Sequence, residues 1–124
     1  MKKRILLIDD DNVYRLALSE FLELYDFKVF TAANGSIGLA LSKALQPDLI
    51  LCDMNMPGLN GEEVLRELRQ NPNTANIPVF ILTANFETKT RFRTLAQGAN
   101  GYLDKTAPLR ELIKSIRKLE INFF

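Results

Sequence analysis

The chain has 124 residues, of which 47% are hydrophobic and 25% are charged, and its formal net charge is +1. This length suits one domain of ordinary composition and leaves little room for a second core. The balanced charge excludes the overall electrostatic attraction that draws a basic chain to nucleic acid or to an anionic membrane. With a single cysteine and no histidine, an intrachain disulfide framework and a soft-ligand metal site are excluded as well.

Short apolar runs alternate along the chain with longer segments of helical periodicity. The runs are RILLI (4–8), KVFTA (28–32), DLILCD (48–53), VFILTA (79–84) and GYLDK (101–105). The first, third and fourth have nearly continuous apolar cores, which is typical of strands covered on both faces of a parallel sheet. The sequence therefore predicts one α/β domain over residues 1–124, with a doubly wound, five-stranded parallel sheet flanked by five helices, as in flavodoxin-like folds.

The segments that follow the runs carry apolar residues at the three- and four-residue spacing of a helix with one buried face. The expected buried positions are Val13, Leu16, Ala17, Phe21 and Leu24; Ile37, Ala40, Leu41, Ala44 and Leu45; Val64, Leu65 and Leu68; Phe92, Leu95, Ala96 and Ala99; and Leu109, Leu112, Ile113, Ile116 and Leu119. No segment has the length of a membrane span, and the apolar stretch after MKKR is too short for a signal peptide. We therefore expect a cytoplasmic protein without a membrane partner.

Polar residues stand where four of the predicted strands end. They are Asp9, Asp10 and Asp11 after the first strand, Asp53 at the third, Thr83 at the fourth and Lys105 at the fifth. In an open α/β sheet, ligands bind beyond the carboxyl ends of the strands, where the strand order reverses. The fold therefore predicts that these side chains converge at one edge.

Each of these residues also has an ordinary structural explanation. Asp11 or Asn12 is expected to cap the next helix, but one helix start needs one cap, so capping does not explain Asp9 and Asp10. Asp53 could be a turn former before MPGLNG, Thr83 a plain strand residue and Lys105 a solvated amine. The combination of residues, and no single one, indicates a functional site.

Three carboxylates brought together repel one another, which raises at least one pKa unless a cation intervenes. Carboxylate and carbonyl oxygens with water suit Mg²⁺, which prefers oxygen ligands. The Lys105 amine and the Thr83 hydroxyl would then suit a transferred phosphoryl group, because they can neutralise or hydrogen-bond its oxygens. Asp53 would be the nucleophile that forms an acyl phosphate.

The segments ILLIDDDN, DLILCDMNMPGLNG, VFILTA and GYLDK follow one another at fixed intervals: 43 residues from Asp10 to Asp53, 30 from Asp53 to Thr83 and 22 from Thr83 to Lys105. In this combination the chain resembles the receiver domain of two-component response regulators, of the chemotaxis-regulator kind. The resemblance implies a signalling switch, not an enzyme, in which Asp53 accepts a phosphoryl group from a histidine kinase or a histidine phosphotransfer protein.

The same resemblance assigns roles to further residues. It implies that Asp9, Asp10, Asp53 and the main-chain carbonyl of Asn55 bind Mg²⁺. Thr83 and Lys105 would contact the phosphoryl group, and Tyr102 would be the switch aromatic. A downstream protein partner is expected on the fourth helix, fifth strand and fifth helix, without direct contact to nucleic acid, while homodimerisation stays open.

Two features depart from the family pattern. The family usually follows its lysine with proline through a cis peptide, whereas Thr106 follows Lys105 here. A cis bond before a non-proline residue costs about 3 kcal/mol, so the Lys105–Thr106 peptide is expected to be either trans with a rearranged loop or strained. Phe86 stands after Thr83 in a region that is often polar in the family, and we hypothesise that its ring restricts water and slows loss of phosphate.

Three other functions remain in competition. A phosphatase of the haloacid dehalogenase type would use Asp9 as its nucleophile and Asp11 as its acid, but it would leave Asp53 unexplained. A flavin- or nucleotide-binding domain is disfavoured because three aspartates would repel a phosphate. A receiver-like docking module that is never phosphorylated would fit a chain in which the Lys105 loop is misplaced.

Overall fold

The computed structural model describes residues 2–123, and of residues 120–123 it describes the backbone alone. Its elements are β1 (Arg4–Ile8), α1 (Asn12–Leu24), β2 (Lys28–Ala32), α2 (Gly35–Leu45), β3 (Leu49–Asp53), α3 (Gly61–Gln70), β4 (Val79–Thr83), α4 (Thr88–Ala96), β5 (Gly101–Asp104) and α5 (Leu109–Phe123). The predicted alternation of strands and helices is confirmed, and every strand lies within one residue of its expected bounds. Within the described range, no helix is both long and apolar enough to cross a membrane.

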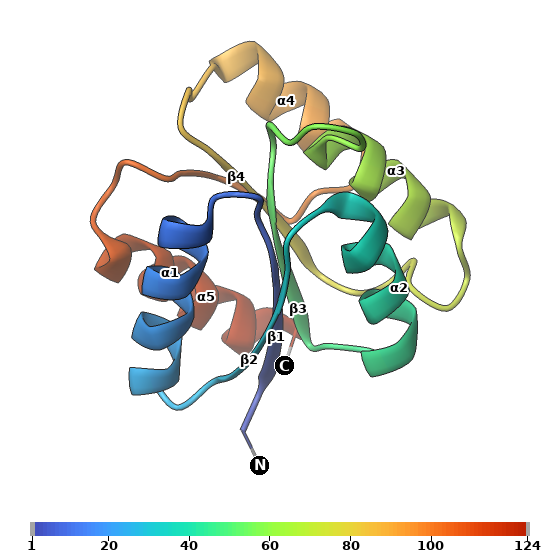
Figure 1. Cartoon of the computed structure of the whole chain (residues 1–124). Helices are drawn as coiled ribbons and strands as arrows, with labels where there is room; N and C mark the ends of the chain where they lie inside the picture. The colour runs from blue at the N-terminus through green and yellow to red at the C-terminus, as the bar shows by residue number, and fades with distance from the viewer. Residues whose placement is uncertain (1, 124) are drawn as a thin grey trace.

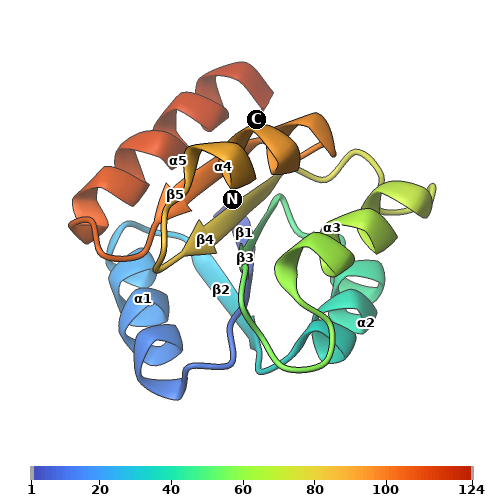
Figure 2. The same ribbon diagram turned by 90° about the horizontal axis from the view of Figure 1, so that it is seen from above.

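All five strands pair in parallel in the order β2-β1-β3-β4-β5. Helices α1 and α5 cover one face of this sheet, and α2 and α3, joined by Leu95 of α4, cover the other (Figures 1 and 2). The chain winds outward from β1 to β2 in one direction and from β3 to β5 in the other. The carboxyl ends of β1 and β3 therefore flank the point at which strand order reverses, where α/β sheets bind their ligands.

Alternating side chains of the central strands build two apolar cores. Leu6 and Ile8 of β1 join the core beneath α2 and α3, whereas Ile5 and Leu7 join the core beneath α1 and α5. Every residue of β3 and of β4 is buried. The continuous apolar runs thus have the cause that the sequence predicts, since both faces of a central strand are covered.

The predicted buried faces hold for α3 and α5 but not for α1 and α2. In α1, Leu18 and Leu22 are fully buried, while Val13, Leu16 and Leu24 are 79%, 61% and 83% exposed. This helix carries two overlapping apolar stripes. The stripe with Leu18 and Leu22 packs against the sheet, and the stripe predicted from the apolar spacing does not.

In α2, small residues face the sheet in place of the expected aliphatic stripe. Gly35, Gly38 and Ser42 are its buried residues, and Ile37 is 47% exposed. A Cβ atom on Gly38 would lie only 2.5 Å from Cδ1 of Ile8, so the missing side chain lets the helix approach β1 closely. Phe92 of α4, also expected inside, is 63% exposed.

At the amino-terminal edge of the sheet, Arg69 of α3 ties several loops together. Its guanidinium donates to the carbonyls of Ala75 (3.1 Å), Ile77 (2.8 Å) and Gly98 (3.0 and 2.8 Å) and to Oδ1 of Asn100 (3.0 Å). The end of α3 is thereby fixed to the segments that lead into β4 and β5.

Candidate functional site

Asp9 and Asp11 lie just after β1 and have different structural roles. Asp11 is the N-cap of α1, and its Oδ1 accepts the N–H groups of Val13 (3.0 Å) and Tyr14 (3.1 Å). Asp9 is fully buried, and its Oδ1 accepts the N–H of Asp11 at 2.9 Å. The helix cap is thus Asp11, one of the two residues expected there, and Asp9 has no part in it.

Asp53 ends β3 and is 5% exposed. The chain after it is held closely, because Met54 N–H donates to Leu82 O and Gly61 N–H donates to Met54 O, both at 2.8 Å. Gly61 opens α3 at this point, and a Cβ atom there would lie 2.6 Å from the main-chain oxygen of Asp53. Only a glycine allows the helix start to approach the strand end so closely.

The structure brings Asp9, Asp10 and Asp53 together, as the sequence predicts. Each offers a carboxylate oxygen, and these oxygens lie within 4.8 Å of one another, with Asp9 and Asp53 buried and Asp10 exposed. Burial first, and then the Asp9 carboxylate, raise the pKa of Asp53 to about 6, against the opposing effects of Lys105 and of the Asn55 N–H. Three clustered hard oxygen donors, one of them open to solvent, fit Mg²⁺.

Lys105 directly follows β5, and its side chain reaches this cluster. Its Nζ lies 2.8 Å from Oδ2 of Asp9 and 3.6 Å from Oδ1 of Asp53, and its side chain is 11% exposed. A hydrogen bond of 2.8 Å from Lys105 N–H to Thr83 O fixes the backbone. We call Asp9, Asp10, Asp53 and Lys105 the acidic centre.

The peptide bond between Lys105 and Thr106 is trans, one of the two outcomes expected. The loop after the lysine is held by Asp104, whose Oδ1 accepts from Thr106 N–H (2.8 Å) and from Thr106 Oγ1 (2.6 Å). The absence of proline after Lys105 therefore does not misplace the amine.

Thr83, at the end of β4, lines a polar hollow of about 230 Å³ beside the acidic centre, together with Asn55, Asn60, Asn85 and Tyr102. We call this the threonine hollow. Thr83 is 1% exposed, and its hydroxyl donates to Asn85 O (3.2 Å) and accepts from Asn85 N–H (3.1 Å). An ion pair of 2.6 Å between Arg93 of α4 and Glu62 of α3 borders the hollow.

Tyr102 and Phe86 lie in contact at the edge of this region. Tyr102 is 5% exposed, and its ring centroid is 5.1 Å from that of Phe86 in an edge-on arrangement. Phe86 is 43% exposed and does not line the threonine hollow, whereas Asn85 does. Its position therefore gives no support to the water-restricting role expected for Phe86, and Asn85 is the residue beside the hydroxyl.

Sequence reasoning missed Tyr14 and the pair of Glu62 and Arg93. The ring centroid of Tyr14 lies 4.3 Å from Lys105 Nζ. Burial and the carboxylates of Asp9, Asp53 and Asp104 raise the pKa of Tyr14 to about 12, so its phenol is neutral at ordinary pH. The available signal was an aromatic residue in the first helical turn after the three aspartates.

Comparison with known proteins agrees with this geometry. The family model described as response regulator receiver domain matches residues 5–117. Protein PilH of Pseudomonas aeruginosa is 37% identical over 113 residues, which are 91% of this chain and 93% of PilH. The DNA-binding dual master transcriptional regulator RpaA of Synechocystis is 38% identical over 116 residues, 94% of this chain but only 48% of RpaA.

Solved structures show the same similarity. The chemotaxis protein CheY4 of Vibrio cholerae superposes with a TM-score of 0.89 at 28% identity, covering 95% of this chain and 98% of that one. The receiver domain of the Francisella response regulator 1452 gives a TM-score of 0.90 at 29% identity and covers 98% of both chains.

Proposed function

This chain belongs to the receiver domains of two-component response regulators, and on that premise we propose that it is a signalling switch whose phosphoacceptor is Asp53. Receiver domains are signalling switches, characteristically phosphorylated on aspartate, and they take the phosphoryl group from histidine kinases. The observation that carries the proposal is the buried Asp53 carboxylate, which lies beside two further carboxylates and 3.6 Å from the Lys105 amine.

In the proposed step, a carboxylate oxygen of Asp53 attacks the phosphorus of a phosphohistidine on a histidine kinase or a phosphotransfer protein. The new oxygen–phosphorus bond forms as the nitrogen–phosphorus bond breaks, and the released imidazole takes up a proton. The Lys105 ammonium is placed to stabilise negative charge on the transferred group.

Mg²⁺ held by Asp9, Asp10, Asp53 and the Asn55 carbonyl would neutralise the phosphoryl oxygens when bound. The acidic centre supports this assignment because its carboxylates repel one another and the single amine of Lys105 only partly offsets their charge. Lys105 must also share its amine with the incoming phosphoryl group, which increases the need for a second cation.

The output would begin at Thr83. We propose that its hydroxyl leaves the Asn85 backbone for the phosphoryl group and that Tyr102, which lines the same threonine hollow, responds to that movement. A downstream protein would then bind at α4, β5 and α5. We further propose that residues 1–124 form one receiver domain, which acts in the cytoplasm.

The phosphatase alternative, with Asp9 as nucleophile, has less support. Both Asp9 oxygens already accept hydrogen bonds, from Lys105 and from Asp11, and the residue is fully buried. The docking-module alternative required a misplaced lysine loop, and Lys105 lies in contact with the acidic centre.

Incubation with acetyl phosphate and Mg²⁺, followed by mass spectrometry of peptides, tests the proposal. We expect one added phosphoryl group on Asp53, which is lost in Asp53→Asn and in excess EDTA. Asp26→Asn is the matched control, because Asp26 pairs with Lys2 on the surface, with an 81% exposed side chain, and should be labelled like wild type. Label on Asp9 would favour the phosphatase, and no label at all the docking module.

A further inference from the structure

The ammonium group of Lys105 rests on an aromatic ring as well as on carboxylates. Its Nζ lies 4.3 Å from the ring centroid of Tyr14, and its side chain is 11% exposed. A cation within about 6 Å of a ring centroid is attracted by the ring, and the attraction grows when solvent is excluded. Lys105 is therefore held by α1 as well as by the end of the sheet.

A ring face suits this place better than another polar group would. The ammonium has three N–H donors, of which Asp9 takes one at 2.8 Å while Asp53 lies at 3.6 Å. A further carboxylate would occupy a donor and add negative charge where a phosphoryl group must bind. The ring attracts the cation without accepting a conventional hydrogen bond, so the donors remain available.

The lysine backbone alone does not determine where its amine lies. The hydrogen bond from Lys105 N–H to Thr83 O and the turn closed by Asp104 and Thr106 fix the main chain, but the four-carbon side chain is flexible. Tyr14, in contrast, is placed by the start of a helix, because its N–H donates to the capping Asp11. The helix cap thus fixes the main chain of Tyr14, and the tyrosine side chain has only two torsions with which to bring its ring to the amine.

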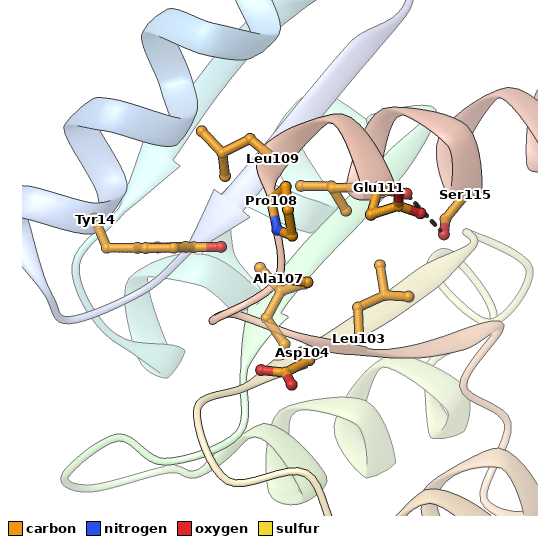
Figure 3. Close-up of a pocket in the computed structure, with 10 residues that line it drawn as sticks. Tyr14, Leu103, Asp104, Ala107, Pro108, Leu109, Glu111 and Ser115 are labelled. Carbon is orange, nitrogen blue, oxygen red and sulfur yellow. Dashed lines mark hydrogen bonds between the residues drawn. The ribbon is translucent and has the colours of Figure 1, made fainter.

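Tyr14 is partly buried and packs against the core beneath α1 and α5. Its ring borders an apolar cavity of about 100 Å³, whose other walls include Ala107 and Pro108 of the loop after Lys105 and Leu109 at the start of α5. Figure 3 shows the ring reaching from α1 toward these residues. Packing accounts for an apolar side chain at this position, but an aliphatic residue would pack there as well, and what the aromatic ring adds is the contact with the Lys105 amine.

We propose that Tyr14 is a positioning residue for phosphoryl transfer, whose ring holds the Lys105 ammonium beside Asp9 and Asp53. The role rests on the proposed function of Asp53 as phosphoacceptor. The phenol hydroxyl has no part in it, so phenylalanine should replace tyrosine and an aliphatic residue should not.

The test compares Tyr14→Phe, Tyr14→Leu and the control Tyr25→Leu. Tyr25 follows the same helix, and its ring lies 5.0 Å from that of Phe21. We expect the rate of Asp53 labelling by acetyl phosphate to stay within about twofold of wild type in Tyr14→Phe and Tyr25→Leu, and to fall about fivefold to tenfold in Tyr14→Leu. Thermal melts establish that each variant is folded, and Tyr14→Met replaces Tyr14→Leu should the latter fail to fold.

Proton NMR of the Lys105 ε-methylene group provides a second readout that needs no phosphorylation. Ring currents should shift this signal upfield in wild type, Tyr14→Phe and Tyr25→Leu, and the shift should vanish in Tyr14→Leu. An unshifted wild-type signal, or wild-type labelling rates in Tyr14→Leu, would overturn the proposal. Failure of wild type to be labelled would instead overturn the function of Asp53, and the NMR comparison would still decide whether the ring holds Lys105.

Discussion

The acidic centre and the threonine hollow lie side by side at the same edge of the sheet, yet they are built in opposite ways. In the acidic centre, Asp9, Asp53 and Lys105 are almost fully buried and contact one another directly. In the threonine hollow, about 230 Å³ is open, and the Thr83 hydroxyl bonds to the backbone of a neighbour. The difference suits the proposed roles, in which the groups that take part in phosphoryl transfer are held in contact and the groups that respond to it border open space.

Among substitutions in the acidic centre, we expect Lys105→Met to have the largest effect. It leaves two buried carboxylates without their cation, so we expect a loss of about 3 kcal/mol in the free energy of unfolding at pH 7.5 in EDTA, measured by urea denaturation. Added Mg²⁺ should restore part of the loss. Lys114→Met is the control, because Lys114 pairs with Glu111 at the surface, with a 68% exposed side chain, and should change little. Equal losses in both variants would contradict the assigned role of Lys105.

Asp53→Asn should act in the opposite direction. The pKa of Asp53 is raised from 3.8 to about 6, so ionising this group costs stability as the pH rises through that range. In EDTA, the variant should therefore be more stable than wild type above pH 6, by at most about 3 kcal/mol, and the difference should disappear below pH 4. Urea denaturation from pH 4 to 8 measures it, with Asp26→Asn as the control that should show no such dependence.

Gly61→Ala tests the close contact between the start of α3 and the main chain of Asp53. The added methyl group would meet the Asp53 carbonyl at 2.6 Å, and a strand backbone cannot yield easily. We expect a loss of about 1–3 kcal/mol and slower labelling of Asp53, since the start of α3 must shift. Gly58→Ala has open space but a φ of +76°, so it should cost only about 1 kcal/mol of backbone strain and leave labelling unchanged.

The smallest expected effect belongs to the ion pair beside the hollow. The hydrogen bond from Arg93 holds the pKa of Glu62 below its ordinary value. The pair therefore stabilises the fold above the usual pKa of glutamate, and this stabilisation is lost as the pH falls through the lowered value. Glu62→Gln should lower Tm slightly at pH 7, and the difference should shrink at acid pH and in high salt. A Tm difference independent of both would show that the charge is not responsible.

Much of the fold could be predicted because the apolar runs of β1, β3 and β4 have only one satisfactory environment, between two layers of helices. The buried faces of the helices were harder to predict. Val64, Leu65 and Leu68 form the single apolar stripe of α3, and they are buried as predicted. α1 offers two overlapping stripes, and spacing alone does not decide between Leu18 and Leu16. In α2, glycines face the sheet. The need for a glycine at Gly38 comes from the close approach of Ile8, which the sequence alone does not reveal.

The functional site also contains residues that could be predicted from the sequence and residues that could not. Asp9, Asp10 and Asp53 could be placed together because parallel topology brings strand ends to one edge. Tyr14 and Arg93 could not, since their partners depend on how α1 and α4 are rotated against the sheet. The path of the loop after Lys105 also depends on a local contact, the Asp104 side chain, that the sequence pattern does not specify.

Arg69 has a mechanical consequence for a molecule of this design. One guanidinium joins the carboxyl-terminal end of α3 to the segments entering β4 and β5, at the opposite edge of the sheet from Asp53. Because these hydrogen bonds hold the carboxyl-terminal end of α3, we expect the helix to tilt about that end more easily than it shifts as a whole. We therefore expect the displacements that accompany the proposed phosphorylation to be largest near Asp53 and to decrease toward the amino-terminal edge of the sheet.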